Sequence, residues 1–591
     1  MYNIKTEWDL KRYFFESIND KRIKEGIDLD LENLKIYIEK YKGRIASLNN
    51  EEFLQFMEDG SIQFKNMTLI HHYYSYLNTL DTQDQSLIKK MGELSNLWAD
   101  AYQDLLFIDE EYKQMGYSKF IEMSKLEMFE PYKNAMINTA NSIKYILTEG
   151  QEKNLIEVGK VISIFDDMYS ELTNSFEYDF RGEKKTESEI LSLRMSDDES
   201  IRKDAVESIM NQYGENKIVV GNIYRAVCKD NISDIKIRGY ESVMHTRNLS
   251  EEMEDDVVNK LLDTVKSNYH MYHRHLKNKA KFLGKDKLEF HDVLAPIPAK
   301  RKNEFSFDEG FDFYMKNIKE FDQEFYDYSL KIFEDGRVSV FPKQGKMSGA
   351  YASYNKDVES FVMLNHTSEF DSIMTLAHEL GHAIHGWYSQ IQKECVYGSP
   401  LSLAETASIF NETFVFEEIL KTVSKEERDY YIMKNLDDIF STTFRQVMYV
   451  DFERECHNRF LDGEELSYED FNEIWLKKNK EFYGDSVNVP EMAKHGWSVI
   501  PHIFHTPFYC YSYSFGNILS FNLYKMYKDA EDKKKFIEMY KNILRAGGSK
   551  RPKDLLMENG IDITSEEFYN KALEVITGLM DSIENKELIA Q

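Results

Sequence analysis

Apolar residues recur at helical spacing along much of the chain, and the pattern is clearest between residues 370 and 389. On a helical wheel, one stripe holds the apolar residues Ile373, Leu376, Leu380, Ile384 and Trp387. His378 and His382 point almost the opposite way. The segment therefore predicts a helix with one face in the core and one face that carries two imidazoles. Thr367 and Ser368, followed by Glu369 and Asp371, predict a capping box at its start.

A second helix is predicted after the turn residue Gly398, with Ser399 as its cap and Pro400 at its first helical position. Its apolar stripe comprises Leu403, Ala407, Phe410 and Phe414. Its other face carries Glu405, Ser408 and Glu412. Because the turn can reverse the chain, this polar face can lie opposite the two histidines.

The composition favours helices over a β-rich fold. The chain has only 9 prolines, 25 methionines and many Leu, Lys and Glu. At 591 residues it is too long for one core, and its 42% of hydrophobic residues suffice for two or three domains. The polar stretch at residues 179–188 predicts a boundary between an N-terminal helical lobe, residues 1–185, and a second domain, residues 186–591. We expect a mostly α, two-lobed fold.

The run His378-Glu379-Leu-Gly-His382 places two histidines four residues apart. On a helix this spacing sets both imidazoles on one face, one turn apart, where they can share a zinc ion. The segment therefore predicts the core of a zinc hydrolase. The alternative interpretation is two histidines that only pack and hydrogen-bond.

A zinc hydrolase needs a third protein ligand and an open position for water. His385 lies about 10.5 Å along the helix axis from His378, too far for one tetrahedral ion that His382 already binds. The metzincin pattern wants Gly at position 385 and His at position 388, where this chain has His385 and Tyr388. The remaining candidate is Glu405, and Glu412 could orient a liganding histidine. For both glutamates, a solvated helix carboxylate is the alternative.

Five segments together resemble the thimet-oligopeptidase family of zinc peptidases, and within it the oligoendopeptidase F group. They span residues 345–351, 361–367, 375–385, 404–412 and 500–513. The resemblance extends more loosely over residues 110–580. It implies a two-lobed helical zincin-like fold with a deep channel, one zinc ion per chain, and cleavage of short peptides rather than folded proteins.

Residue by residue, the resemblance makes His378, His382 and Glu405 the zinc ligands and Glu379 the general base. It also makes His502 a donor to the oxyanion of the reaction, together with one or more of three nearby tyrosines: Tyr509, Tyr511 and Tyr513. Which tyrosine acts stays open, because the spacing from His502 departs from that of the better-known mammalian members. Without the resemblance, this aromatic run would be assigned to core packing.

Residues 359–365 predict a short strand just before the zinc-binding helix. Such a strand can pair with an extended peptide substrate, and it can equally be an ordinary strand of a small sheet. The two interpretations are compatible. The main hypothesis is a zinc-dependent oligoendopeptidase. The alternatives are a zinc carboxypeptidase or dipeptidase of related helical fold, and a catalytically silent peptide-binding scaffold.

The charge excludes two classes of partner. With 74 basic and 103 acidic residues, the net charge of −29 argues against nucleic acid and against an anionic membrane surface. The four cysteines have no paired or metal-binding spacing, which is typical of free thiols in a reducing compartment. The chain begins without an apolar secretory core, so we expect a cytoplasmic enzyme whose partners are short peptides.

Overall fold

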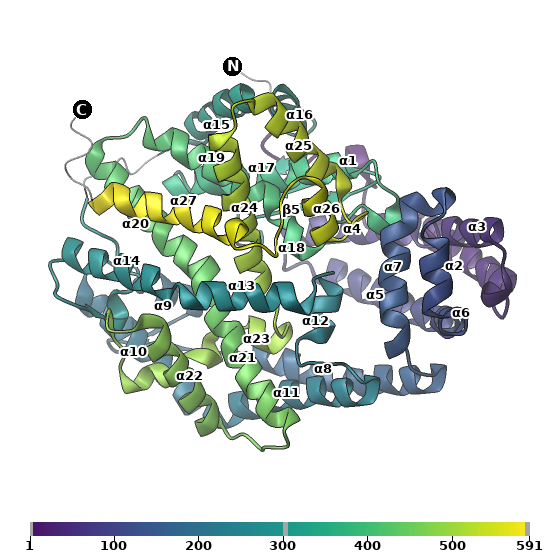
Figure 1. The fold of residues 1–591 in the computed structure, drawn as a ribbon, viewed down its shortest axis with the longest axis horizontal. Coiled ribbons are helices and arrows are strands. Elements are labelled where there is room, and N and C mark those ends of the chain that lie inside the picture. The colour runs from purple at the N-terminus through teal and green to yellow at the C-terminus, as the bar shows by residue number, and fades with distance from the viewer. Residues whose placement is uncertain (1–3, 300–304, 585–591) are drawn as a thin grey trace. The chain divides into compact units, whose positions relative to one another are not determined.

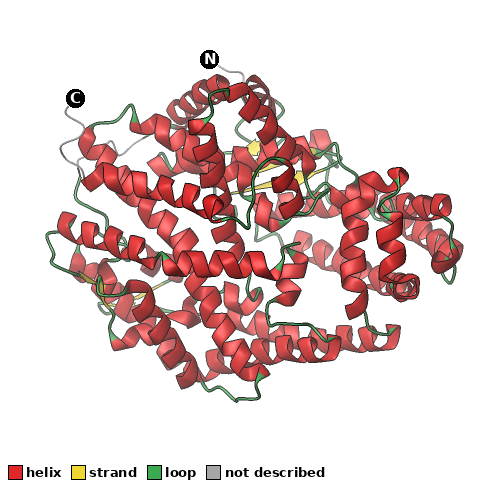
Figure 2. Ribbon diagram, viewed as in Figure 1, coloured by secondary structure: helices red, strands yellow, loops and turns green. Residues whose placement is uncertain are grey.

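The computed structural model describes residues 4–299 and 305–584, and these are mostly helical (Figures 1 and 2). Strands in the described part of the chain are few and short, and they form two two-stranded sheets and one three-stranded sheet. The three-stranded sheet packs against the helix that carries His378 and His382. The predicted fold class, mostly α with a small sheet near that helix, is confirmed.

Packing divides the chain into two compact units, each built from three separate stretches. Unit 1 comprises Met1–Asn154, Asn303–Glu418 and Ala530–Gly560. Unit 2 comprises Leu155–Lys302, Ile419–Asp529 and Ile561–Gln591. The domain boundary predicted at residue 185 is a single division along the chain, and it stays a prediction.

Unit 1 contains the three-stranded sheet and the helices that surround it. Its helices are α1 (Leu10–Tyr13), α2 (Lys21–Tyr41), α3 (Asn50–Gly60), α4 (Lys65–Leu80), α5 (Gln85–Leu105), α6 (Phe107–Met123), α7 (Lys133–Ser142), α15 (Phe307–Phe321), α16 (Gln323–Glu334), α17 (Phe370–Ser389), α18 (Leu401–Ala404), α19 (Thr406–Leu420, which runs on into unit 2), α25 (Lys533–Ala546) and α26 (Pro552–Glu558). Its strands are β4 (Val338–Ser339), β5 (Tyr351–Asn355) and β6 (Glu359–Met363).

Unit 2 is built almost entirely of helices. They are α8 (Glu149–Asn174, which begins in unit 1), α9 (Glu187–Leu193), α10 (Glu199–Glu215), α11 (Lys217–Arg238), α12 (His245–Ser250), α13 (Asp255–Ser267), α14 (Tyr269–Phe282), α20 (Lys425–Ile439), α21 (Arg445–Leu461), α22 (Tyr468–Tyr483), α23 (His502–His505), α24 (Tyr511–Asp529) and α27 (Glu566–Glu584). Its strands are β1 (Tyr178–Phe180), β2 (Glu183–Lys185), β3 (Leu288–Glu289) and β7 (Val487–Asn488).

The strand predicted at residues 359–365 is β6, and it lies at the centre of the three-stranded sheet. β5 pairs with it antiparallel and β4 pairs with it parallel, so both of its edges are hydrogen-bonded. The prediction that this strand pairs with substrate is therefore wrong, and the other interpretation, an ordinary strand of a small sheet, is correct. Among the described residues, no strand pairs with the outer edge of β5.

α17 has the two faces that its sequence predicts. Ile373, Leu376, Leu380 and Ile384 are buried, and Trp387 stacks on Tyr328 at a centroid distance of 4.7 Å. The predicted capping box is wrong, because Ser368 has a positive φ of 64° and the cap residue, Glu369, makes no side-chain cap hydrogen bond. The N–H of Thr367 donates instead to the Ser372 hydroxyl at 3.1 Å.

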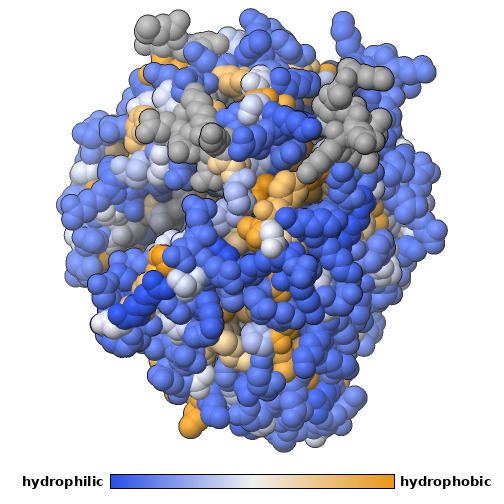
Figure 3. All heavy atoms as spheres, turned by 90° about the vertical axis from the view of Figure 1, so that its left-hand side faces the viewer, coloured by the Kyte–Doolittle hydropathy of each residue, from blue (hydrophilic) through white to orange (hydrophobic). Residues whose placement is uncertain are grey.

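The surface follows the composition. The face drawn in Figure 3 is mostly hydrophilic, with hydrophobic residues in small groups, as the high content of charged residues predicts. Across residues 4–299 and 305–584, every helix is too short or too polar to cross a membrane. The cytoplasmic location stays a prediction.

Candidate metal centre and its surroundings

His378, His382 and Glu405 come together in unit 1, with their potential ligand atoms within 4.8 Å of one another. The nearer Glu405 carboxylate oxygen lies 3.4 Å from Nε2 of His378 and 3.5 Å from Nε2 of His382. Atoms bound tetrahedrally to one zinc at about 2.0–2.2 Å are about 3.3–3.6 Å apart. Two imidazole nitrogens and one carboxylate oxygen at this spacing therefore fit a zinc ion.

Glu405 does not lie within a continuous helix. The sequence predicts one helix with Ser399 as its cap, but the cap is Pro400, α18 ends at Ala404 and α19 begins at Thr406. Glu405 occupies the break between them. Its carboxylate accepts a hydrogen bond from the Ser408 hydroxyl at 2.8 Å, which holds the side chain in place.

Gly381 lets α19 approach α17 closely enough for Glu405 to lie beside the histidines. A Cβ atom at this position would lie 2.5 Å from the Ala407 carbonyl oxygen and 2.6 Å from the Ser408 Cα. The side-chain amide of Asn411 also donates to the Ala377 carbonyl at 2.5 Å, which joins the two helices. The sequence reasoning missed both contacts, although a glycine between two potential ligands is a signal of close packing.

Glu412 holds His378 from the side away from Glu405. Its carboxylate lies 3.1 Å from Nδ1 of His378, which confirms the predicted contact. With Nδ1 donating to Glu412, Nε2 faces Glu405. Burial lowers the pKa of His378, but the Glu412 and Glu405 carboxylates outweigh burial and raise the pKa to about 9. The site thus favours positive charge.

Glu405 and Glu379 add two further carboxylates. Burial raises the pKa of Glu405, but the hydrogen bond and charge of His382, with the charge of His378, lower it to about 2. Glu379 is only 6% exposed, and burial raises its pKa. One of its carboxylate oxygens is buried with no hydrogen-bond partner in the described part of the chain. Glu379 therefore offers a free acceptor next to the candidate metal site.

His385 has a structural role, because the candidate ligand group does not include it. Its ring is buried, with Nε2 2.9 Å from the Ser399 hydroxyl, and burial lowers its pKa to about 4. The interaction ties the end of the loop after α17 back to that helix.

His502, Tyr509 and Tyr513 form a group of rings in unit 2. The His502 ring lies parallel to Tyr509 at a centroid distance of 6.1 Å and edge-on to Tyr513 at 5.9 Å, and the two tyrosines lie 5.0 Å apart. Burial lowers the pKa of His502, so its imidazole favours the neutral form. Because these residues belong to unit 2 and the candidate ligands to unit 1, their catalytic role stays a prediction.

Tyr511 differs from the other two tyrosines. It is fully buried, and its hydroxyl has no hydrogen-bond partner among the described residues. Burial raises its pKa well above the ordinary value. Burial therefore favours Tyr509 and Tyr513, which are partly exposed, as the residues that can contact a ligand.

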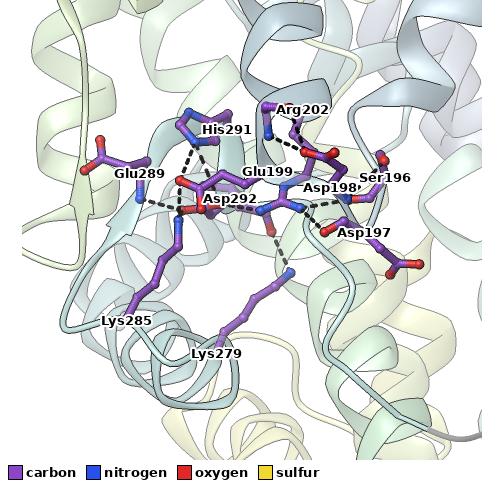
Figure 4. A network of polar contacts seen from close by, with 12 residues as sticks. Ser196, Asp197, Asp198, Glu199, Arg202, Lys279, Lys285, Glu289, His291 and Asp292 are labelled. Atoms are coloured by element: carbon purple, nitrogen blue, oxygen red, sulfur yellow. Dashed lines mark hydrogen bonds and ion pairs between the residues drawn. The ribbon is translucent and has the colours of Figure 1, made fainter.

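The structure also brings together Glu199, His291 and Asp292 in unit 2, a group that the sequence reasoning missed (Figure 4). The two Asp292 oxygens lie 2.6 Å from Arg202 and 2.6 Å from Lys285, and Lys285 also lies 2.7 Å from Glu199. Two cations already balance the two carboxylates. We therefore interpret this group as a salt-bridge network that fixes the segment around His291.

Comparison with known proteins assigns the chain to a family. Residues 192–575 match the family described as Peptidase family M3. The chain therefore belongs to peptidase family M3. It is 25% identical to the oligopeptidase PepF of Bacillus subtilis over 570 residues, which cover 93% of this chain and 82% of that protein. It is 28% identical to an oligoendopeptidase F homolog of Borreliella burgdorferi over 451 residues, 74% of this chain and 75% of that protein.

A solved structure shares the fold of this M3 peptidase. The oligoendopeptidase-F structure from Enterococcus faecium superposes with a TM-score of 0.72 at 21% identity and covers 96% of this chain and 98% of that chain. The M3 match includes all three candidate ligands, Glu379, His502 and the three tyrosines.

Proposed function

We propose that this M3 peptidase is a zinc-dependent oligoendopeptidase that hydrolyses internal bonds of short, unstructured peptides. The observation that carries the proposal is the spacing of His378, His382 and Glu405, at 3.4 and 3.5 Å between nitrogen and oxygen. The names of the relatives, which are oligopeptidases and oligoendopeptidases, support the internal cleavage of short chains.

The candidate ligands suit zinc chemistry. A zinc ion held by His378, His382 and Glu405 would lower the pKa of a water molecule and polarise the scissile carbonyl group. Glu412, through its hydrogen bond to Nδ1, keeps the His378 Nε2 lone pair directed at the ligand group.

Glu379 is the proposed general base. Its buried carboxylate takes the proton of the attacking water and then delivers that proton to the departing amine. Burial supports this role, because a desolvated carboxylate accepts a proton more readily than a solvated one. Glutamine at this position would keep the shape and lose the basicity.

The outer edge of β5 is the proposed binding edge for the peptide backbone. A peptide that adds there as a strand is recognised through main-chain hydrogen bonds, which tolerate many side chains. β5 packs against α17, the helix that carries two of the candidate ligands. An added strand would lie along the edge of β5 that is opposite β6.

His502, Tyr509 and Tyr513 are the proposed donors to the oxyanion of the tetrahedral intermediate. A phenol O–H or imidazole N–H about 3 Å from that oxygen stabilises the transition state by about 2.7–4 kcal/mol. Their partial exposure and mutual ring contacts support the assignment.

The test is mass spectrometry of the products from peptides of 4 to about 20 residues, incubated with zinc-loaded wild type, Glu379→Gln and Glu320→Gln. Glu320 is an exposed carboxylate of α15 in the same unit and provides the matched control. We expect internal cuts by wild type and Glu320→Gln, lost with chelator and restored by zinc, and no cuts by Glu379→Gln. Stepwise loss of terminal residues would instead identify an exopeptidase, and no cleavage by wild type would favour a peptide-binding scaffold.

A further inference from the structure

Unit 2 contains a cavity of about 470 Å³, within the range of sites that bind small ligands. His502 lines it, so the cavity adjoins a residue of the proposed catalytic group. The rest of the wall is partly apolar, with Met448, Tyr449 and Trp475, and partly charged, with Arg194 and Arg445. Apart from His502, the residues named here have no part in the proposed zinc chemistry.

The two arginines share the cavity without a carboxylate partner. In the described part of the chain, no acidic oxygen lies within 4.0 Å of either guanidinium. Arg445 donates to the Ser441 hydroxyl, and its Nε atom is buried with no partner. Burial lowers the pKa of Arg194, and the charge of Arg445 lowers it further. Two like charges in one partly apolar cavity are costly unless an anion joins them.

The nearby acidic residues do not supply that anion at contact distance. Burial lowers the pKa of Arg445, and the charge of Asp438 is among those that raise it, but Asp438 forms no ion pair with that guanidinium in the described part of the chain. Asp292 and Glu199 are already paired with Arg202 and Lys285 in the network of Figure 4. Glu187 also lines the cavity, but it is the first residue of α9, whereas Arg194 directly follows the last residue of that helix. The Cα atoms of Glu187 and Arg194 are therefore about 10 Å apart along the helix axis.

Arg445 also follows an irregular turn. Residues Phe440–Phe444 form a π-helix, and Arg445 is the first residue of α21 after it. π-helical turns are rare and occur frequently at functional sites, because they redirect a side chain. The turn therefore precedes the residue that contributes a guanidinium to the cavity wall.

We propose that this cavity binds a carboxylate of the peptide substrate through Arg194 and Arg445. A guanidinium fork can hold both carboxylate oxygens, and the apolar wall suits the hydrocarbon part of the same residue. The carboxylate comes either from an acidic side chain or from the free C-terminus. This proposal rests on the proposed function, because the cavity adjoins His502, a proposed donor to the oxyanion.

The test uses two series of peptides with one cleavable core. In the first series, Glu at each position in turn is compared with Gln, and in the second, the free C-terminal acid is compared with the amide. We expect one series to contain a peptide whose kcat/KM with wild type exceeds that of its neutral match by about tenfold or more. The preferred series identifies the source of the carboxylate. Equal rates in every pair would overturn the proposal.

Variants locate the preference. The ratio of kcat/KM between the acidic peptide and its match should fall below about twofold in Arg445→Gln and in Arg194→Gln, and should be intermediate in Arg445→Lys. Arg459→Gln, which removes a guanidinium paired with Glu464 elsewhere in unit 2, should keep the wild-type ratio. An unchanged ratio in Arg194→Gln and Arg445→Gln would overturn the proposal. If Arg445→Gln does not fold, the kcat/KM ratio of Arg194→Gln, compared with that of wild type, tests the proposal.

A binding measurement separates this proposal from the proposed function. Fluorescence anisotropy with Glu379→Gln compares the affinities of each acidic peptide and its match without turnover. Tighter binding of the acidic member, with no cleavage of any peptide by wild type, would retain the carboxylate site and reject the peptidase. Equal binding, with cleavage of all peptides by wild type, would reject the carboxylate site and retain the peptidase.

Discussion

The buried carboxylate of Glu453 accepts a hydrogen bond from the backbone N–H of Phe508 at 2.8 Å. Phe508 has a positive φ of 62°, a strained conformation for a bulky residue, and it directly precedes Tyr509. Arg247 donates to the carbonyl of Pro507 at 3.3 Å, which is the carbonyl of the same peptide group. These two contacts fix the backbone that leads into the group formed by His502, Tyr509 and Tyr513.

Glu453→Gln should change the pH dependence of stability. Burial raises the pKa of Glu453 to about 8, since the Phe508 N–H and the Arg247 charge offset burial only in part. An unfolded chain has a carboxyl pKa of about 4.3. Between these values the folded state binds more protons, so wild-type stability should fall as pH rises through this window, by up to about 1.4 kcal/mol per unit.

Thermal melting between pH 5 and 8.5 measures this effect. Gln stays neutral and keeps an acceptor for Phe508, so the melting temperature of wild type should fall relative to that of Glu453→Gln as pH rises. Glu320→Gln, in which an exposed carboxylate is lost, should follow wild type. Parallel curves for wild type and Glu453→Gln would show that Glu453 titrates normally.

Gly381→Ala should weaken zinc binding and destabilise the protein. The new Cβ would lie 2.5 Å from the Ala407 carbonyl oxygen, so α19 must move away from α17 and carry Glu405 with it. We expect a loss of about 1–3 kcal/mol in stability and a weaker zinc affinity in a competition assay with a chelating dye. Gly92→Ala in α5, where the Cβ meets no atom within 4 Å, should be neutral or stabilising. Unchanged zinc affinity in Gly381→Ala would contradict the role of the close contact.

Glu412→Gln should lower zinc affinity about 10- to 100-fold, because the hydrogen bond to Nδ1 of His378 loses its charge. The same dye competition measures it, and Glu320→Gln again provides the control. Peptide cleavage at saturating zinc should recover in part, which separates a residue that positions a ligand from one that takes part in the reaction. Wild-type affinity in Glu412→Gln would assign the carboxylate no part in metal binding.

Tyr513→Phe should lower kcat about 100-fold with a small change in KM, if its hydroxyl donates to the oxyanion. Tyr511→Phe should leave kcat within twofold, because that hydroxyl is buried without a partner in the described part of the chain. Steady-state kinetics on one quenched fluorescent peptide compares the two. A kcat within twofold of wild type for Tyr513→Phe would remove it from the oxyanion role.

Local patterns predicted the parts of the site that depend on helical periodicity. The apolar stripe of α17 and the spacing of His378 and His382 follow from 3.6 residues per turn, and the contact of Glu412 with His378 follows from the same rule. The break at Glu405 did not follow from periodicity, and neither did the close contact at Gly381, which depends on the packing of two helices. The central position of β6 depends on pairing with β4 and β5, which no single segment encodes.

Sequence patterns could not predict the cavity in unit 2, for a related reason. Arg194 and Arg445 are far apart in sequence, and each taken alone resembles a solvated residue next to a helix end. Only the tertiary structure shows that both arginines line one cavity, which is the proposed carboxylate site.

The division of unit 1 into three stretches sets an order of events during synthesis. α25, the third stretch of that unit, packs against α17, and its Tyr540 hydroxyl donates to the Thr406 carbonyl beside Glu405 at 3.4 Å. The backbone N–H of Gly548 also donates to Val396 at 2.9 Å, in the loop between the histidines and Glu405. A nascent chain that has reached residue 530 therefore already contains every proposed zinc ligand but lacks α25, which packs against α17. We expect the proposed metal site to gain this packing only after residues 533–548 have left the ribosome.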